Sequence, residues 1–308
     1  MAELENPDII VHIGRFTPTI SDSDVYECKY FVTEDSVYYK DKTLRNSWAF
    51  QLSGLEHRAQ LKLNIHTSSY TLRSLIAPGL FTHILLMPII ELQLLKMNYL
   101  FPHAGAVSKD GRAYLLSGRG AAFKTSLVMN LVRNGYGYMG DERVVVGPKS
   151  ILSFPTHIKI FSFYLSELRD ENIRLFDRLR LVAFLTKHNT TNAEVTDESQ
   201  LSGLFYISPS STAFHANKLD VETAVTKMKF NQRLDYLEMA KVLGLSQSPI
   251  LGCLMAYLAS HPKSQLTTMW KDFSAKLRQL LRSVPIHELS IPLEYRTETT
   301  DFVRKLMD

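Results

Sequence analysis

The sequence has few cysteines and no long uninterrupted apolar run. Only two of its 308 residues are cysteine, Cys28 and Cys253, and they stand far apart. Two separated thiols exclude a disulfide framework and a thiolate metal cluster, so a reducing cytoplasm is expected. The most apolar stretch, residues 75–101, is broken by prolines, a glycine and charges, and it offers no apolar span of about 18 residues. We therefore expect a buried helix pair there and no membrane anchor.

Charge of one sign is also scarce. The net charge is +4, and no block of lysine and arginine stands out, so neither nucleic acid nor a membrane surface is expected as a partner. An apolar fraction of 45% and a charged fraction of 21% are typical of a globular protein. No H-E-x-x-H zinc motif and no G-x-S-x-G nucleophile motif occur, which argues against those two classes of hydrolase.

The hydrophobic pattern changes along the chain. Residues 8–75 form short runs of alternating apolar and polar residues, one of them at residues 25–32, and such runs are typical of the strands of an antiparallel sheet. Helical spacing replaces this pattern at residues 78–99, where Pro88 suits the first turn of a helix. Later segments alternate between strand and helix patterns, and from about Asp220 the chain is expected to be mainly helical. We predict a mixed α/β protein with a β-rich recognition or assembly domain, residues 1–90, and a second domain, residues 91–308.

The segment AYLLSGRGAAFKTSLVMNLVRNG, residues 113–135, carries the strongest chemical signal. Residues 103–117 are expected to form a strand, a turn at Asp110-Gly111 and a second strand. A glycine-containing loop and an amphipathic helix follow, with Gly135 as the expected C-terminal cap of the helix, which is the setting of a phosphate-binding loop. The residues expected to cradle a nucleotide are Gly118, Arg119, Gly120, Ala121, Ala122, Phe123, Lys124, Thr125 and Ser126. Phe123 replaces the usual second glycine. Because this position enters the helix, we expect a backbone conformation open to any residue, with the ring packed away or stacked on a base.

Spacing around this loop resembles that of the HPr kinase/phosphorylase family. His103 lies 15 residues before Gly118, and the acidic pair Asp141-Glu142 begins 17 residues after Lys124, in the segment LVRNGYGYMGDERVVV. The resemblance covers residues 101–162 and is to a divergent relative of the family. It implies a phosphate-loop kinase domain of the phosphoenolpyruvate-carboxykinase type, which uses ATP or another nucleoside triphosphate with Mg²⁺.

The resemblance also implies a role for each residue. Lys124 would contact the β- and γ-phosphates, Thr125 and Glu142 would support the metal, and His103 would approach the phosphates or orient the acidic pair. One member of the pair would accept the proton of an attacking hydroxyl, and the choice between Asp141 and Glu142 stays open. The acceptor would be a seryl residue of a protein or peptide, or a small alcohol or amino acid. Self-association is left open, and the alternative function is an inactive nucleotide-binding regulatory module.

Overall fold

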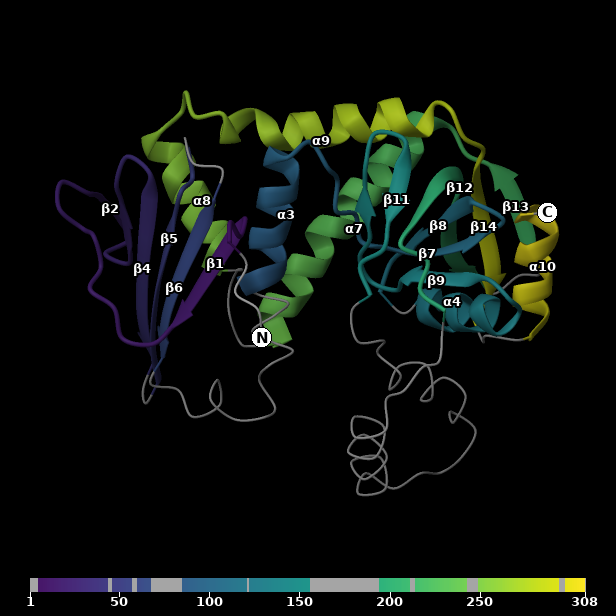
Figure 1. The fold of residues 1–308 in the computed structure, drawn as a ribbon, viewed down its shortest axis with the longest axis horizontal. Helices are drawn as coiled ribbons and strands as arrows, with labels where there is room; N and C mark the ends of the chain where they lie inside the picture. Colours follow the sequence, from purple (N-terminus) through teal and green to yellow (C-terminus); the bar gives the residue numbers. More distant parts are fainter. Residues whose placement is uncertain are drawn as a thin grey trace, which may run out of the picture. The chain divides into compact units, whose positions relative to one another are not determined.

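The computed structural model describes residues 5–43, 46–56, 60–67, 85–120, 122–155, 194–210, 214–242, 249–293 and 297–307. The chain forms two compact units. The first comprises Met1–Asn98 and Arg233–Phe273, and the second comprises Tyr99–Gln232 and Ser274–Asp308. Strands and helices occur in both (Figure 1). The predicted mixed α/β class is confirmed.

The first unit contains a six-stranded sheet in the order β1-β6-β5-β4-β3-β2. Its strands are β1 (Ile9–Ile13), β2 (Asp24–Tyr26), β3 (Tyr30–Val32), β4 (Ser36–Thr43), β5 (Asn46–Ser53) and β6 (Leu61–Thr67). Four of the neighbouring pairs are antiparallel, as predicted, but β1 pairs with β6 in parallel. No hairpin joins β1 to its partner, because residues 14–23 lead the chain from one edge of the sheet to the other, and so nothing local requires an antiparallel pair.

The segment expected to form one strand at residues 25–32 is instead a hairpin. Glu27 and Cys28, between β2 and β3, both have φ of 52°. The turn is closed by a hydrogen bond from the Lys29 N–H to the Tyr26 carbonyl oxygen at 3.0 Å. Two successive residues with positive φ suit the twist of a tight hairpin, and the apolar pattern alone did not show this break.

The helices of the first unit pack against one face of its sheet. Residues of β3 to β6, such as Phe50, share one buried core with α3 (Met87–Lys96) and with α8 (Pro249–Ser260). Pro88 lies in the first turn of α3, as predicted. The division expected at residue 90 differs from the one observed, because α8 buries its apolar residues, including Cys253, against this sheet. Residues 233–273, assigned from the sequence to the second domain, therefore belong to the first unit.

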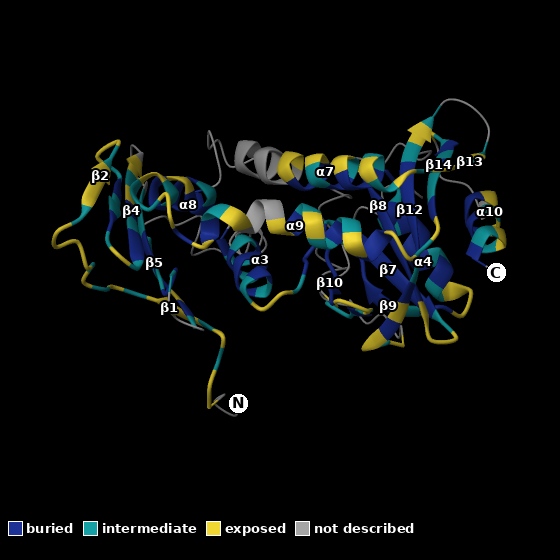
Figure 2. Ribbon diagram, turned by 90° about the horizontal axis from the view of Figure 1, so that it is seen from above, coloured by how far each residue is buried: buried dark blue, intermediate teal, exposed yellow. Residues whose placement is uncertain are grey.

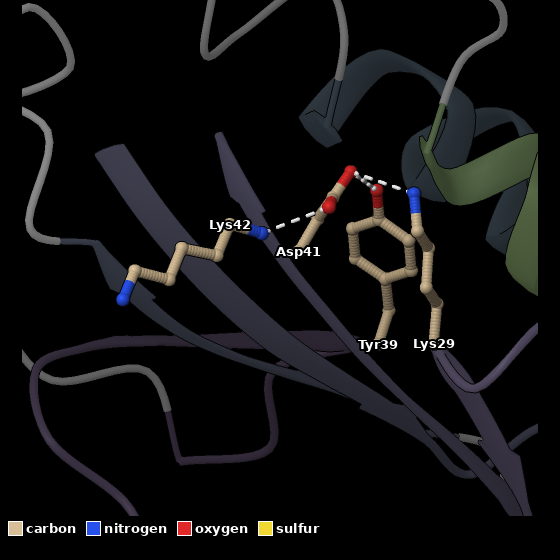
Figure 3. Close-up of polar contacts among 4 residues, drawn as sticks. All are labelled: Lys29, Tyr39, Asp41 and Lys42. Atoms are coloured by element: carbon tan, nitrogen blue, oxygen red, sulfur yellow. Dashed lines mark hydrogen bonds and ion pairs between the residues drawn. The ribbon is translucent and has the colours of Figure 1, made fainter. Parts of the chain in front are cut away.

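Asp41 of β4 accepts three hydrogen bonds at the margin of this sheet (Figure 3). The donors are the Lys29 ammonium at 3.2 Å, the Tyr39 hydroxyl at 3.0 Å and the Lys42 backbone N–H at 2.8 Å. Burial alone would raise the pKa of Asp41, but the hydrogen bonds outweigh it and hold that pKa below its usual value. This network ties the β2–β3 turn to the C-terminal half of β4.

The second unit is built on a larger sheet. The main path runs β10-β11-β12-β8-β7-β9, and β14 joins β12 to β13. The strands are β7 (Ala104–Lys109), β8 (Arg112–Gly118), β9 (Gly137–Gly140), β10 (Val145–Val146), β11 (Ser150–Leu152), β12 (Glu198–Ser210), β13 (His215–Lys218) and β14 (Ile286–Pro292). Strands β7, β8 and β12 are mostly buried, whereas β2 of the first unit carries exposed residues (Figure 2). Neither β13 nor α10 (Thr297–Met307) was predicted from the sequence pattern.

Helices cover both faces of this second sheet. Phe205 and Ile207 of β12 share a core with α4 (Lys124–Arg133) and with α10. Between them Tyr206 points to the opposite face, where its hydroxyl accepts a hydrogen bond from Asn231 of α7 (Val221–Val242) at 2.9 Å. The last long helix, α9 (Leu266–Leu281), has residues in both units, as α7 does. A strand buried on both sides explains why β12 has so few polar residues in its middle.

The predicted strand–turn–strand–loop–helix order at residues 104–133 is confirmed. Asp110 and Gly111 form the turn between β7 and β8 with φ of 51° and 74°. Gly135, with φ of 86°, ends α4 as expected, and the Tyr136 N–H donates to the Leu131 carbonyl oxygen at 3.2 Å. Predictions for residues 69–75, 78–84 and 156–193 lie outside the described residues. Among those described, no helix has the length and apolarity needed to cross a membrane.

Candidate nucleotide site

Sheet register brings the start of β7, the end of β8 and the segment after β9 together at one end of these neighbouring strands. Strand β7 lies between β8 and β9 and is antiparallel to both. Its first residue, Ala104, pairs with Ser117 at the end of β8, and His103 forms a bridge with Arg143 just after β9. His103 is therefore held beside the start of the glycine loop and beside the acidic segment. Sequence spacing of 15 and 17 residues had suggested this convergence only through the family resemblance.

The loop leaves β8 at a point where the backbone is crowded. A Cβ on Gly118 would lie 2.7 Å from the Ile207 carbonyl oxygen of β12 and 3.2 Å from the Ala122 Cβ. Such contacts leave no room for a side chain, so the glycine is needed for the strand to pass β12. Arg119 and Gly120 then lie exposed at the tip, and Ala122 returns to the interior. Ala121, also expected in the nucleotide site, lies outside the described residues.

Phe123 has a left-handed backbone, with φ of 60° and ψ of 20°. This corrects the expectation that its position would suit any residue, because the left-handed region favours glycine. The loop therefore keeps the backbone conformation that a glycine would adopt, although the residue is a phenylalanine. The ring is partly buried and packs against the core that contains α4, so the side chain has a packing role.

Lys124, the first residue of α4, turns its side chain back over the loop. Its ammonium group donates to the Gly118 carbonyl oxygen at 2.8 Å and to the Arg119 carbonyl oxygen at 3.0 Å. The side chain is only 8% exposed. A buried cation is thus held at the N-terminal end of a helix, where the backbone N–H groups and the helix dipole also favour an anion. Ser126 follows in the first turn of α4 and is buried.

Thr125 connects the loop to the acidic pair. Its hydroxyl donates to the Asp141 Oδ2 atom at 2.9 Å, across 16 residues of chain. Asp141 is 2% exposed, whereas Glu142 is half-buried. Close packing fixes the end of β9 here, since a Cβ on Gly140 would lie 2.5 Å from the Arg143 carbonyl oxygen. The predicted loop hydroxyl and the first of the two predicted carboxylates are therefore in direct contact.

Arg143 was not among the expected site residues, although it follows the acidic pair directly. It is buried, donates a hydrogen bond to the Phe101 carbonyl oxygen at 3.0 Å, and lies 5.6 Å from the centre of the Phe101 ring. These contacts tie the acidic segment to the residues that lead into His103. The sequence did offer a signal for Arg143, since it directly follows two carboxylates. A buried arginine needs such partners.

The donor set fits a magnesium nucleotide. Mg²⁺ in phosphoryl-transfer sites is held by one or two carboxylates or hydroxyls together with phosphate oxygens and water, and Thr125 and Asp141 supply such oxygens. Among the described residues no group of three or more histidine, cysteine or acidic side chains could hold a metal alone. A site that includes substrate phosphates does not need such a group.

Comparison with known proteins gives little further information. No protein-family model and no curated protein sequence matches the chain. One similar solved structure is the Hpr(Ser) kinase/phosphatase from Coxiella burnetii, at 13% sequence identity and a TM-score of 0.22. The match covers 39% of this chain and 77% of that one. A likeness of this size is too weak to support an assignment of fold or function.

Proposed function

We propose that this chain is a kinase that transfers the γ-phosphoryl group of ATP, or of another nucleoside triphosphate, to a hydroxyl. The observation that carries the proposal is the hydrogen bond between Thr125 and Asp141, because it joins the phosphate-type loop to a carboxylate. Lys124, held over the loop by two carbonyl oxygens, supplies the cation that the β- and γ-phosphates require. Phosphoryl transfer depends mainly on positioning and on charge stabilisation, which are the properties this arrangement offers.

The two residues of the acidic pair differ in burial, and we assign them different roles. Asp141 is engaged by Thr125 and is almost fully buried, so we assign it, with Thr125, to the metal. Glu142 is more exposed and is the better candidate for the general base that meets an incoming acceptor. The earlier expectation gave the metal to Thr125 and Glu142, and the two assignments differ in the effect expected from each substitution. Bound Mg²⁺ would neutralise negative charge on the phosphates.

The acceptor oxygen forms a bond to the γ-phosphorus, the bond from that phosphorus to the β–γ bridging oxygen breaks, and the hydroxyl proton passes to the carboxylate of Glu142. ADP carries away the electron pair of the broken bond. His103, whose backbone bridges to Arg143, would orient this carboxylate pair or approach the phosphates. The acceptor is a seryl residue of a protein or peptide, or a small alcohol.

A second candidate function is nucleotide binding without turnover. The strained backbone of Phe123, in the position of the usual second glycine, favours it, because the added ring limits how the loop adapts to phosphates. Both candidates predict nucleotide binding, so only turnover distinguishes them.

Turnover is tested by incubating the chain with γ-labelled ATP and Mg²⁺ and measuring slow hydrolysis or transfer to extract proteins and peptides. Glu142→Gln should lower kcat by roughly 10²-fold or more and leave nucleotide affinity nearly unchanged. Asp141→Asn should instead raise the Mg²⁺ requirement and weaken nucleotide binding. Turnover in both variants equal to that of the parent would refute the mechanism, and binding without any turnover would favour the regulatory module.

A further inference from the structure

Tyr138, in the middle of β9, has a buried hydroxyl group with no hydrogen-bond partner among the described residues. The residue is 3% exposed and belongs to the core that also contains α4. Its backbone is fully paired, since the N–H donates to the Glu194 carbonyl oxygen at 2.8 Å and the carbonyl accepts from Thr196 at 3.0 Å. The hydroxyl is thus the one polar group of Tyr138 that has no partner among the described residues.

At least two other buried tyrosines among the described residues donate a hydrogen bond from the hydroxyl group. Tyr114, in the same core, donates to the Met307 carbonyl oxygen at 2.8 Å. Tyr257 of the first unit donates to the Glu34 carbonyl oxygen at 2.7 Å. A buried hydroxyl without a partner costs stability, and phenylalanine would fill the same space without that cost. The hydroxyl of Tyr138 therefore calls for a partner that another state of the protein supplies.

The surroundings of Tyr138 indicate which partner this is. The residue stands three positions before Asp141 on the same chain segment. Burial, followed by the negative charges of Asp141 and Glu142, raises the pKa of Tyr138 above its usual value. Tyr138 packs in the core that contains α4, and Asp141 accepts a hydrogen bond from Thr125 of the same helix, so both side chains lie on the α4 side of this segment. The hydroxyl keeps its proton at neutral pH and can donate it in a hydrogen bond to a carboxylate.

We propose that Tyr138 is a positioning residue, whose hydroxyl donates a hydrogen bond to the Asp141–Glu142 pair when a magnesium nucleotide is bound. This inference rests on the proposed kinase function. In this structure the Thr125 hydroxyl donates a hydrogen bond to Asp141. A bound metal would contact the same carboxylate oxygens. A second hydrogen-bond donor, from the protein interior, would keep the acidic pair oriented while the metal is bound. A hydrogen bond from the tyrosine hydroxyl to a carboxylate is also stronger than one to a neutral acceptor.

The test compares Tyr138→Phe with Tyr114→Phe in the full chain. Thermal unfolding is followed without nucleotide and with Mg²⁺ and a non-hydrolysable ATP analogue, and the affinity for the analogue is measured by calorimetry. Tyr138→Phe should unfold at the parent temperature or above it without nucleotide, yet bind the analogue about tenfold more weakly. Its nucleotide-induced rise in unfolding temperature should be correspondingly smaller. Tyr114→Phe should unfold at a lower temperature without nucleotide and show the parent's nucleotide-induced rise, because its hydroxyl already has a partner.

Two results would overturn the role of Tyr138. One is a lower unfolding temperature for Tyr138→Phe without nucleotide, because its hydroxyl would then already be bonded. The other is an undiminished nucleotide-induced rise in that variant. If the parent itself shows no rise, the proposed function fails and this inference fails with it, and the parent's result identifies that case.

Discussion

The difference in stability between Phe123→Gly and Phe123→Ala tests the left-handed backbone of the loop. Both substitutions remove the partly buried ring, so its loss of packing cancels when the two variants are compared. They differ in the backbone, which has φ of 60° in the left-handed region. An L-residue there costs about 1–2 kcal/mol, which glycine avoids. Glycine gives back roughly 0.4–1 kcal/mol through its more flexible unfolded chain.

We expect the free energy of unfolding of Phe123→Gly to be about 1 kcal/mol larger than that of Phe123→Ala. Urea unfolding followed by circular dichroism is the suitable assay. Tryptophan fluorescence would report only the first unit, which contains both Trp48 and Trp270.

Asn130, within α4, provides the matched control. Glycine in a helix interior is about 1 kcal/mol less favourable than alanine, so Asn130→Gly should be less stable than Asn130→Ala. The sign of the glycine–alanine difference should therefore reverse between residues 123 and 130. A Phe123→Ala variant as stable as Phe123→Gly, or more stable, would refute the left-handed loop and with it the argument that the loop keeps its phosphate-binding geometry.

Three further predictions concern single side chains. Lys124→Ala removes the ammonium held over the loop, so calorimetry should show at least a tenfold loss of affinity for magnesium ATP, and an unchanged affinity would contradict the role of this lysine. Gly118→Ala should lower the free energy of unfolding by about 1–3 kcal/mol, because its Cβ meets the Ile207 carbonyl oxygen. Gly135→Ala, in open space but with φ of 86°, should lower it by only about 1 kcal/mol, and urea titration compares the two. Asp41 has a lowered pKa in the folded state, so its stabilising effect is present above the unfolded pKa and is lost as the pH falls through the folded pKa. The difference in urea midpoint between the parent and Asp41→Asn should therefore shrink from pH 7 to about pH 3, and a constant difference would show that the carboxylate charge is not involved.

Local chemistry allowed the segment from β7 to α4 to be predicted from the sequence. The Asp110-Gly111 pair specifies a tight turn, and the change from strand to helix spacing marks the loop between β8 and α4. Each of these signals acts over a few residues. Their agreement along one continuous segment is the reason why the predicted order of elements was correct.

Features that depend on distant residues could not be predicted in this way. The parallel pairing of β1 with β6 joins Ile9 to Leu61, and nothing near either residue specifies it. The left-handed backbone of Phe123 contradicts the preference of its side chain and is imposed by the surrounding loop. Tyr138 fits the alternating pattern of a buried strand, so its sequence position gave no sign that its hydroxyl has no partner among the residues that the structure describes.

A crystal structure of the protein with Mg²⁺ and a non-hydrolysable ATP analogue would show whether the loop from Gly118 to Ser126 binds the phosphates of a nucleotide. We expect the β-phosphate to lie against the backbone N–H groups of residues 120–125. The Lys124 ammonium should then bind the phosphates in place of its loop carbonyl partners. Phosphates bound elsewhere on the protein, or a loop that binds none at saturating analogue, would contradict this expectation.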